Sequence, residues 1–318
     1  MDPVFRPLSA AEASAPGKVI LCGEHSVVYG QPAIAAPVSA LRAQVRVLPG
    51  PLGMGLEVVA PDVGQRVRLA EAAADDPLVA VPRALLSRHD LAEPDGRIEI
   101  RSALPIASGL GSGAAVAVAM ARALLLALDL PPELEEVSAL AFEAEKLHHG
   151  TPSGIDQTVI TWEAPIFFVR GTPPQRLSLG APVDLLIAHS GVAASTRELV
   201  SGVRLRAQAD PATYTRYFAQ MGELALAARE ALAAGELERL GQLFDRNHEL
   251  LQAIGVSHPR LEALVNAARQ AGALGAKLTG AGGGGNIISL ITPDKADMVR
   301  AALLEAGAAQ VWSTRLEA

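Results

Sequence analysis

A glycine-rich turn that runs without a break into an alanine-rich helix constrains the fold of this sequence more than any other feature. Pro105-Ile-Ala-Ser-Gly-Leu-Gly-Ser-Gly-Ala-Ala-Val-Ala-Val-Ala-Met-Ala-Arg122 contains both parts. The N–H groups of residues 110–114 lack intrahelical acceptors, and the positive end of the helix dipole favours a phosphate beside them. Glycines at alternate positions remove the Cβ atoms that would keep an anion away from the backbone. The alternative is an ordinary helix start capped by Ser112.

Composition and charge limit the class of protein. Half of the 318 residues are hydrophobic but only 3% are aromatic, so we expect helices packed on sheets through Ala, Val, Leu and Ile. The length suggests about two domains. The net charge of −7 argues against nucleic acid or an anionic membrane as a partner.

The sequence also predicts where the protein is found. The longest apolar run, residues 114–128, is interrupted by Arg122 and is too short to span a bilayer. The N-terminus lacks the basic start and apolar centre of a signal peptide. We therefore expect a soluble cytoplasmic protein. Cys22 is the single cysteine, which excludes an intramolecular disulfide, and its apolar surroundings predict a buried, inert thiol.

Three polar side chains surround one short apolar segment near the N-terminus. Val19–Cys22 is predicted to be a buried strand, preceded by a turn at residues 15–18. Lys18, Glu24 and His25 are then expected to converge at the mouth of a sheet. Each also has an ordinary explanation: a solvated charge, the partner of that charge, and a hydrogen-bonded histidine at a strand end.

The chain that follows alternates between period-two and helical patterns. Period-two segments separated by turns predict an antiparallel meander. Strands are expected at 43–48, 55–59, 67–69, 97–101 and 165–169, and helices at 77–88, after the glycine-rich turn, and at 133–149.

Two carboxylates in this part of the chain have candidate roles. Glu145 borders the apolar stripe of the helix at 133–149, where it is either a surface charge or a metal ligand. Gly150 is expected to end that helix. Asp156 lies in a turn-rich loop just before a predicted strand, Val159–Trp162, and its alternative role is an Asx-type turn cap.

Beyond a linker at 171–182, the pattern is strand, helices, strand, strand, helix, strand. This is a split βαβ order. The predicted elements are a strand at 183–188, a helix opened by a capping box at 195–198, helices at 211–234, 236–254 and 259–272, strands around Lys277–Thr279 and at 286–291, a helix from 294, and a strand at 310–314.

Other phosphate-binding and metal classes fit poorly. Gly17-Lys18 lacks the flanking residues of a Walker A motif. A dinucleotide-binding site needs a glycine-rich turn that opens a helix and an acidic residue on a second strand. The glycines at 280–285 lead into a strand rather than a helix. The acid that would follow the first turn, Asp129, precedes another helix rather than standing on a strand, so the sequence fits this class poorly. No His-Glu-x-x-His pair is present, and the seven histidines are scattered.

Three segments, in order, resemble the motifs of the GHMP kinases, the superfamily of galactokinase, homoserine kinase, mevalonate kinase and phosphomevalonate kinase. They are Ser14–Gly30, Pro105–Ala115 and Lys277–Gly285. The resemblance is closest to the mevalonate kinase branch, through Gly23-Glu-His25 and the segments 149–156 and 191–200.

This resemblance implies an α/β (α+β) protein with the two-domain GHMP kinase fold. Its N-terminal ATP-binding half, residues 1–180, is expected to resemble ribosomal protein S5 domain 2. Its C-terminal half, residues 181–318, is expected to be ferredoxin-like, with the site between the two. The split βαβ order agrees with the second expectation.

The resemblance also implies the site residues. ATP, the co-substrate, is expected on Pro105, Ser108, Gly109, Leu110, Gly111, Ser112, Gly113 and Ala114. Mg²⁺ is expected on Glu145 and the Ser112 hydroxyl. Asp156 and Lys18 are the expected catalytic pair: Asp156 takes or orients the proton of the acceptor hydroxyl, and Lys18 stabilises the attacking oxygen. Substrate contacts are expected from Lys18, Glu24, His25, Asp156, Thr196, Gly282 and Gly283, with Lys18 and His25 as cations facing the substrate carboxylate.

The sequence departs from the family pattern at two positions. Gly113 stands where the family usually has a second serine that binds the metal, so Ser112 or water must supply that ligand. His189 stands where the family often has an acid.

The expected reaction is phosphorylation of the 5-hydroxyl of mevalonate by ATP, with a homodimer as the common assembly in the family. Phosphomevalonate kinase, homoserine kinase and a non-catalytic nucleotide sensor are the alternatives.

Overall fold

The computed structural model describes residues 4–105, 108–149 and 153–317. The described chain folds as two compact units, each assembled from stretches that are distant in sequence. Unit 1 contains the chain up to Gly17, residues 41–105 and residues 111–163. Unit 2 contains residues 18–40, the short segment that ends at Leu110, and the chain from Ala164 onward. The boundary between residues 180 and 181 stays a prediction.

Two long strands supply residues to both units. They are β1 (Ala11–Cys22) and β2 (Ala33–Pro49), which pair with each other. The other elements of unit 1 are β3 (Leu56–Ala60), η2 (Pro61–Val63), β4 (Gln65–Arg68), α1 (Ala80–Arg88), β5 (Gly96–Ser102), α2 (Ser112–Ala127), α3 (Leu134–His149) and α4 (Ile155–Trp162).

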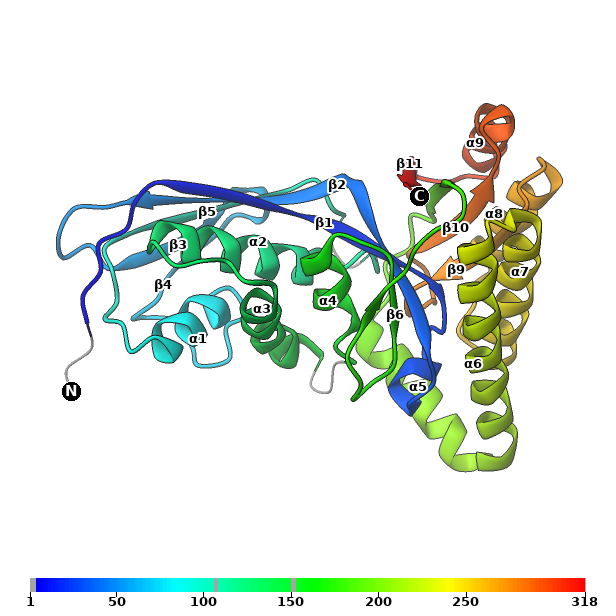
Figure 1. The fold of residues 1–318 in the computed structure, drawn as a ribbon, viewed down its shortest axis with the longest axis horizontal. Helices are drawn as coiled ribbons and strands as arrows, with labels where there is room; N and C mark the ends of the chain where they lie inside the picture. Colours follow the sequence, from blue (N-terminus) through cyan, green and yellow to red (C-terminus); the bar gives the residue numbers. More distant parts are fainter. Residues whose placement is uncertain (1–3, 106–107, 150–152, 318) are drawn as a thin grey trace. The chain divides into compact units, whose positions relative to one another are not determined.

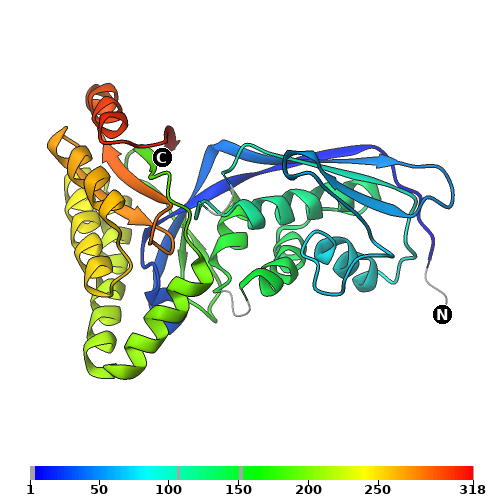
Figure 2. The same ribbon diagram turned by 180° about the vertical axis from the view of Figure 1, so that it is seen from behind.

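The sheet of unit 1 is not the meander that its sequence predicts. Strand β5 lies between β2 and β3, antiparallel to the first and parallel to the second, and β4 pairs with β3. Helices α1, α2 and α3 lie on one side of these strands in both views (Figures 1 and 2). The small side chains of α2 allow this packing, since alanines fill most of its buried positions.

Unit 2 has a sheet with the strand order of a ferredoxin-like fold, β11-β8-β10-β9, with neighbouring strands antiparallel. The predicted split βαβ order is therefore confirmed. Its elements are η1 (Ser26–Tyr29), β6 (Ile166–Phe168), β7 (Gln175–Arg176), β8 (Val183–His189), α5 (Thr196–Ala209), α6 (Pro211–Ala234), α7 (Leu237–Ala253), α8 (Pro259–Gln270), β9 (Gly275–Thr279), β10 (Asn286–Ile291), η3 (Pro293–Lys295), α9 (Ala296–Glu305) and β11 (Gln310–Leu316).

Helix α6 shows how local sequence sets an element's ends. The Asp210 side chain accepts a hydrogen bond from the N–H of Thr213 at 3.2 Å, and Pro211 occupies the first helical position. The helix ends at Gly235, which adopts a left-handed conformation at φ 73°. The predicted bounds, 211–234, are confirmed.

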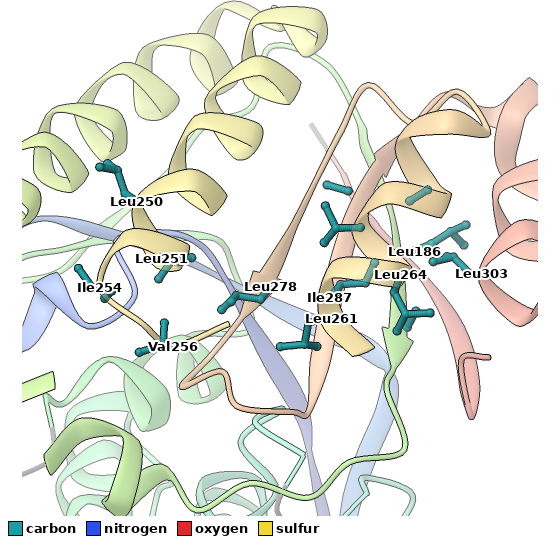
Figure 3. Packing of buried hydrophobic residues seen from close by; sticks show 14 of the residues in the cluster. Leu186, Leu250, Leu251, Ile254, Val256, Leu261, Leu264, Leu278, Ile287 and Leu303 are labelled. Atoms are coloured by element: carbon teal, nitrogen blue, oxygen red, sulfur yellow. The ribbon is translucent and has the colours of Figure 1, made fainter. Parts of the chain in front are cut away.

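The core of unit 2 lies between its sheet and its helices. Figure 3 shows Leu278 of β9 and Ile287 of β10 close to leucines of α7 and α8, and α6 runs beside α7 in Figures 1 and 2. Each fully buried leucine stabilises the fold by about 1.5–3 kcal/mol.

Strand β9 is an edge strand whose outer backbone is covered by α7. The Asp245 carboxylate accepts a hydrogen bond from the N–H of Ala276 at 2.9 Å, and His248 Nδ1 accepts one from the N–H of Leu278 at 3.3 Å. These side chains satisfy donors that a free edge would expose.

Two predictions of local structure are wrong. The expected turn at 15–18 is part of β1, because Pro16 and Gly17 lie within a long, mostly buried strand. The segment containing Asp156 is not a loop before a strand: residues 155–162 form helix α4, whose buried face packs against α2 and α3. The predicted C-cap Gly150 lies outside the described residues.

Two further expectations can be compared with the structure. Among the described residues, no helix has both the length and the apolarity needed to cross a bilayer. Cys22 is a buried free thiol, and burial raises its pKa to about 12, which makes it a poor nucleophile.

Candidate functional site

The glycine-rich turn leads into α2 as its sequence predicts. Gly111 precedes the helix in a left-handed conformation at φ 74°, and within the described part of the chain no side chain caps it. The helix begins at Ser112, which is therefore a first-turn residue rather than the cap. Gly113 is exposed and Ala114 is buried. The N–H groups of this first turn are the kind of donors that bind phosphate oxygens.

The turn on the other side of Gly111 is held by hydrogen bonds to its carbonyl oxygens within unit 2. The carbonyl of Leu110 accepts a hydrogen bond from the N–H of Lys18 at 2.9 Å. The carbonyl of the buried Ser108 accepts one from Asn286 Nδ2 at 2.5 Å. Gly109, at φ 86°, adopts a conformation that side chains disfavour. Strands β1 and β10 therefore fix this half of the turn.

Lys18 is buried near the middle of β1, and the same strand ends in the turn that carries Glu24 and His25. Two residues after Lys18 in β1, the N–H of Ile20 donates to Thr279 Oγ1 at 2.9 Å. The Thr279 hydroxyl in turn donates to the carbonyl of Ile20 at 3.0 Å. Strand β1 is thus joined to β9 just before the glycine-rich segment 280–285.

His25 bonds to this second glycine-rich segment. Its Nε2 donates to the carbonyl of Ala281 at 2.9 Å. Burial lowers the pKa of His25 to about 4, the hydrogen bond to Ala281 opposes that shift, and the nearby Arg206 adds to it. The ring is therefore neutral at pH 7, with the proton on Nε2 and Nδ1 as an acceptor. The expectation that His25 is a cation is corrected: its chemistry suits a substrate hydroxyl rather than a carboxylate.

Glu24, expected to contact the substrate, is buried among protein groups. Its carboxylate forms an ion pair with Lys277, and Oε2 accepts a hydrogen bond from Asn247 Nδ2 at 2.9 Å. Lys277 and Asn247 were not expected at the site. The sequence could have indicated Lys277, because a lysine within a buried strand is unusual. Nothing in the sequence around Asn247 indicates a role for that residue.

The glycines of the second segment are shaped by close backbone contacts. A Cβ on Gly282, which has φ 83°, would lie 2.0 Å from the carbonyl oxygen of Val256. The N–H of Gly283 donates to the same oxygen at 2.7 Å, so that N–H is already used within the protein. A Cβ on Gly283 would lie 2.9 Å from Leu199 of α5.

Thr196 opens α5, and the predicted cap of this helix is confirmed. The Ser195 hydroxyl accepts a hydrogen bond from the N–H of Glu198 at 3.3 Å. Thr196 itself is half-buried. The contact of Leu199 with Gly283 joins this helix to the second glycine-rich segment.

Unit 1 contains both remaining carboxylates of the predicted site. Glu145 is buried on α3, and Asp156 lies half-buried in the first turn of α4. Helices α2, α3 and α4 pack against one another. Asp156 and its expected partner Lys18 belong to different units.

A charged cluster that was not predicted fixes the end of α4. Arg122, on α2, donates to the Glu163 carboxylate at 2.6 Å and to the carbonyl of Thr161 at 2.7 Å. Arg42 binds the same carboxylate through both terminal nitrogens, at 2.9 and 3.0 Å. Arg122 therefore ties the helix of the phosphate turn to the helix that carries Asp156.

The candidate metal ligands fit an ion that arrives with a nucleotide. Mg²⁺ is commonly held by one or two carboxylates together with phosphates and waters. Glu145 offers a buried carboxylate, and Ser112 offers a hydroxyl at the start of α2. Within the described residues, no group of three or more His, Cys, Asp or Glu side chains is arranged to hold a metal by itself.

Family models match both parts of the chain. The GHMP kinase N-terminal domain matches residues 78–163, which include α2, α3 and α4. The GHMP kinase C-terminal model matches residues 228–309, which include β9 and the second glycine-rich segment. The fold and the site thus define a small-molecule kinase of the GHMP class.

Individual relatives narrow this class. The chain is 38% identical to a mevalonate kinase of Thermococcus gammatolerans over 93% of each chain. It is 37% identical to that of Aeropyrum pernix over 88% of each chain. The crystal structure of L. major mevalonate kinase in complex with R-mevalonate has a TM-score of 0.83 and 32% identity, covering 99% of this chain and 98% of that one. The chain belongs to the mevalonate kinase family within the GHMP kinases.

Proposed function

We propose that this protein transfers the γ-phosphoryl group of ATP to the 5-hydroxyl of mevalonate, forming 5-phosphomevalonate. The observation that carries the choice of acceptor is the similarity, over 99% of the chain, to the enzyme whose structure holds R-mevalonate. The segment Gly23-Glu-His25, which carries the resemblance to mevalonate kinases, supports this choice, and a hydrogen bond to Ala281 holds His25 in place.

ATP is proposed to bind with its phosphates on the turn that opens α2. The turn from Pro105, through Ser108, Gly109 and Leu110, to Gly111 would approach the phosphates, while the first-turn N–H groups of Ser112, Gly113 and Ala114 would donate to their oxygens. Phosphoryl transfer needs mainly positioning and charge stabilisation, and helix dipole and backbone donors supply both.

Mg²⁺ is proposed to accompany ATP, held by Glu145 and by Ser112 or a water in place of the hydroxyl that Gly113 lacks. When bound, Mg²⁺ would neutralise charge on the phosphates of ATP. Glu145 lies on α3, which packs against the α2 helix that begins at Ser112, and this arrangement supports the role.

Asp156 is proposed to accept or orient the proton of the 5-hydroxyl, and Lys18 to stabilise charge on the attacking oxygen and on the transferred group. His25 is proposed to accept a hydrogen bond from a substrate hydroxyl through Nδ1, while Thr196 and the backbone of Gly282 and Gly283 complete the substrate side. The substrate carboxylate then requires a cation other than His25.

The test is an acceptor panel. The protein is incubated with ATP and Mg²⁺ and, separately, with mevalonate, phosphomevalonate, homoserine or galactose, while ADP release is followed. Mevalonate is expected to give the highest kcat/KM. A higher value for another acceptor would overturn the assignment, and ATP binding without ADP release for any acceptor would identify a nucleotide sensor instead.

Assembly and location belong to the same proposal. We propose a homodimer, because dimers are common among GHMP kinases, and a cytoplasmic location. Sedimentation equilibrium would measure the mass in solution, and a mass equal to that of one chain would contradict the dimer.

A further inference from the structure

A buried ion pair joins the turn that carries His25 to strand β9. The side chain of Lys277 is 0% exposed and that of Glu24 is 1% exposed. Two charges removed this far from water are costly unless every donor and acceptor is matched. The groups that surround the two charges therefore show which elements the ion pair connects.

Lys277 is fully matched by its partners. Besides Glu24, its ammonium donates to the carbonyl of Leu278 at 2.7 Å and to that of Ile20 at 3.3 Å. An ammonium has three donors, and here they reach its own strand β9, the neighbouring strand β1 and the turn that follows β1. In Figure 3, Leu278 points into the helical core of unit 2. Because successive side chains of a strand point to opposite faces, the side chain of Lys277 projects from the other face of β9.

Glu24 receives its second bond from a third element. Asn247, 0% exposed on α7, donates to Oε2 at 2.9 Å. The next residue, His248, accepts a hydrogen bond from the N–H of Leu278, so α7 and β9 are fixed to each other at the level of the ion pair. The carboxylate of Glu24 is thus held from two sides.

The residue that follows Glu24 has a backbone that needs support. His25 adopts φ 59° and ψ −49°, a positive-φ conformation that costs a non-glycine residue roughly 1–3 kcal/mol. Such conformations persist where surrounding contacts determine them. The contacts that hold it include the anchored Glu24, the hydrogen bond from His25 to Ala281, and a backbone bond from the N–H of Ser26 to the carbonyl of Glu24 at 2.6 Å.

We propose that Lys277 and Asn247 are positioning residues that act through Glu24, and that Glu24 serves the reaction by fixing the His25 turn against the second glycine-rich segment rather than by contacting the substrate. The inference rests on the proposed function, since His25 is assigned there to the substrate. It extends that function with two residues that hold Glu24 from α7 and from β9.

The test separates positioning from simple stability. Glu24→Leu and Lys277→Met each leave one buried charge without its partner, so each is expected to lower the Tm strongly. The double variant Glu24→Leu/Lys277→Met removes both charges with side chains of similar size, and such replacements commonly restore stability. Its Tm is expected to return close to that of the wild type, while its KM for mevalonate stays raised about tenfold to a hundredfold and its KM for ATP changes less than about twofold.

Asn247→Ala provides the second arm, with Arg246→Ala as the matched control. Arg246 is the preceding residue on α7 and pairs with Glu249 at the exposed surface. Asn247→Ala is expected to raise the KM for mevalonate, and Arg246→Ala to leave it unchanged. Equal KM values for the two variants would contradict a role for Asn247.

A readout that does not depend on turnover is the NMR signal of the His25 ring in ¹⁵N-labelled protein, assigned with a His25→Gln variant. In the double variant, the Nε2 resonance is expected to shift as the hydrogen bond to Ala281 weakens. A double variant with wild-type stability, wild-type KM and an unshifted resonance would overturn the inference. Absence of mevalonate turnover by the wild type would instead overturn the proposed function, so the two failures are distinguishable.

Discussion

Gly282→Ala is the substitution whose effect follows most directly from the structure. The new Cβ would lie 2.0 Å from the carbonyl oxygen of Val256, a backbone atom that cannot move aside as a flexible side chain does. The left-handed backbone costs alanine roughly 1–2 kcal/mol, and an overpacked contact costs about 1–3 kcal/mol more. Together these lower the free energy of unfolding by about 2–5 kcal/mol.

Gly171→Ala supplies the control for this prediction. Gly171 has nearly the same conformation, φ 82°, but a Cβ there would have nothing within 4 Å, and it lies in the same unit. Gly171→Ala therefore carries only the backbone cost. A difference of about 1–3 kcal/mol corresponds to a Tm roughly 1.5–5 °C lower for Gly282→Ala, measured by calorimetry at the same scan rate. Equal Tm values would refute the claim that contact with Val256 shapes the second glycine-rich segment.

Three further outcomes are expected. Asp156→Asn should lower kcat by about 10²–10⁴-fold with unchanged affinity in a titration with a fluorescent nucleotide, and an active variant would remove Asp156 from the base role. Although burial opposes ionisation of Glu163, hydrogen bonds from Arg42 and Arg122 hold its pKa below the usual 4.5. The wild type should therefore exceed Glu163→Gln in Tm above about pH 4.5 and lose that advantage as the pH falls through the lowered pKa; a constant difference across this range would contradict the argument. NMR should show the His25 ring neutral at pH 7 and titrating near pH 4, whereas titration near pH 6.5 would show that burial does not control its charge.

Local signals predicted much of the C-terminal half. The Asp210–Pro211 start and the Gly235 stop define α6 because capping depends on a few neighbouring residues. The same holds for the Ser195 cap of α5. Split βαβ order followed from the sequence of elements, and the ferredoxin-like sheet confirms it.

Predictions failed where distant contacts override local preference. Residues 159–162 are all of types that favour strands, yet they lie in helix α4. Packing of α4 against α2 and α3 buries most of their side chains and overrides the local preference. Insertion of β5 between β2 and β3 is likewise a long-range pairing that no local pattern contains.

For the site, the sequence indicated individual residues but not how the protein holds them. The glycine-rich turn at α2 was recognisable because a helix start and its glycines are local features. The charge of His25 was mistaken because burial, which lowers its pKa, arises only in the folded chain. Asn247 was missed for the same reason: it meets Glu24 across more than two hundred residues of sequence.

The identity of the phosphorylated product tests the central claim most directly. After incubation of the protein with ATP, Mg²⁺ and R-mevalonate, proton-coupled ³¹P NMR is expected to show one new phosphomonoester signal, split by the neighbouring CH₂ protons, in an amount equal to the ADP formed. An unsplit signal would place the phosphoryl group on the tertiary hydroxyl, and the absence of any new phosphomonoester would contradict mevalonate phosphorylation.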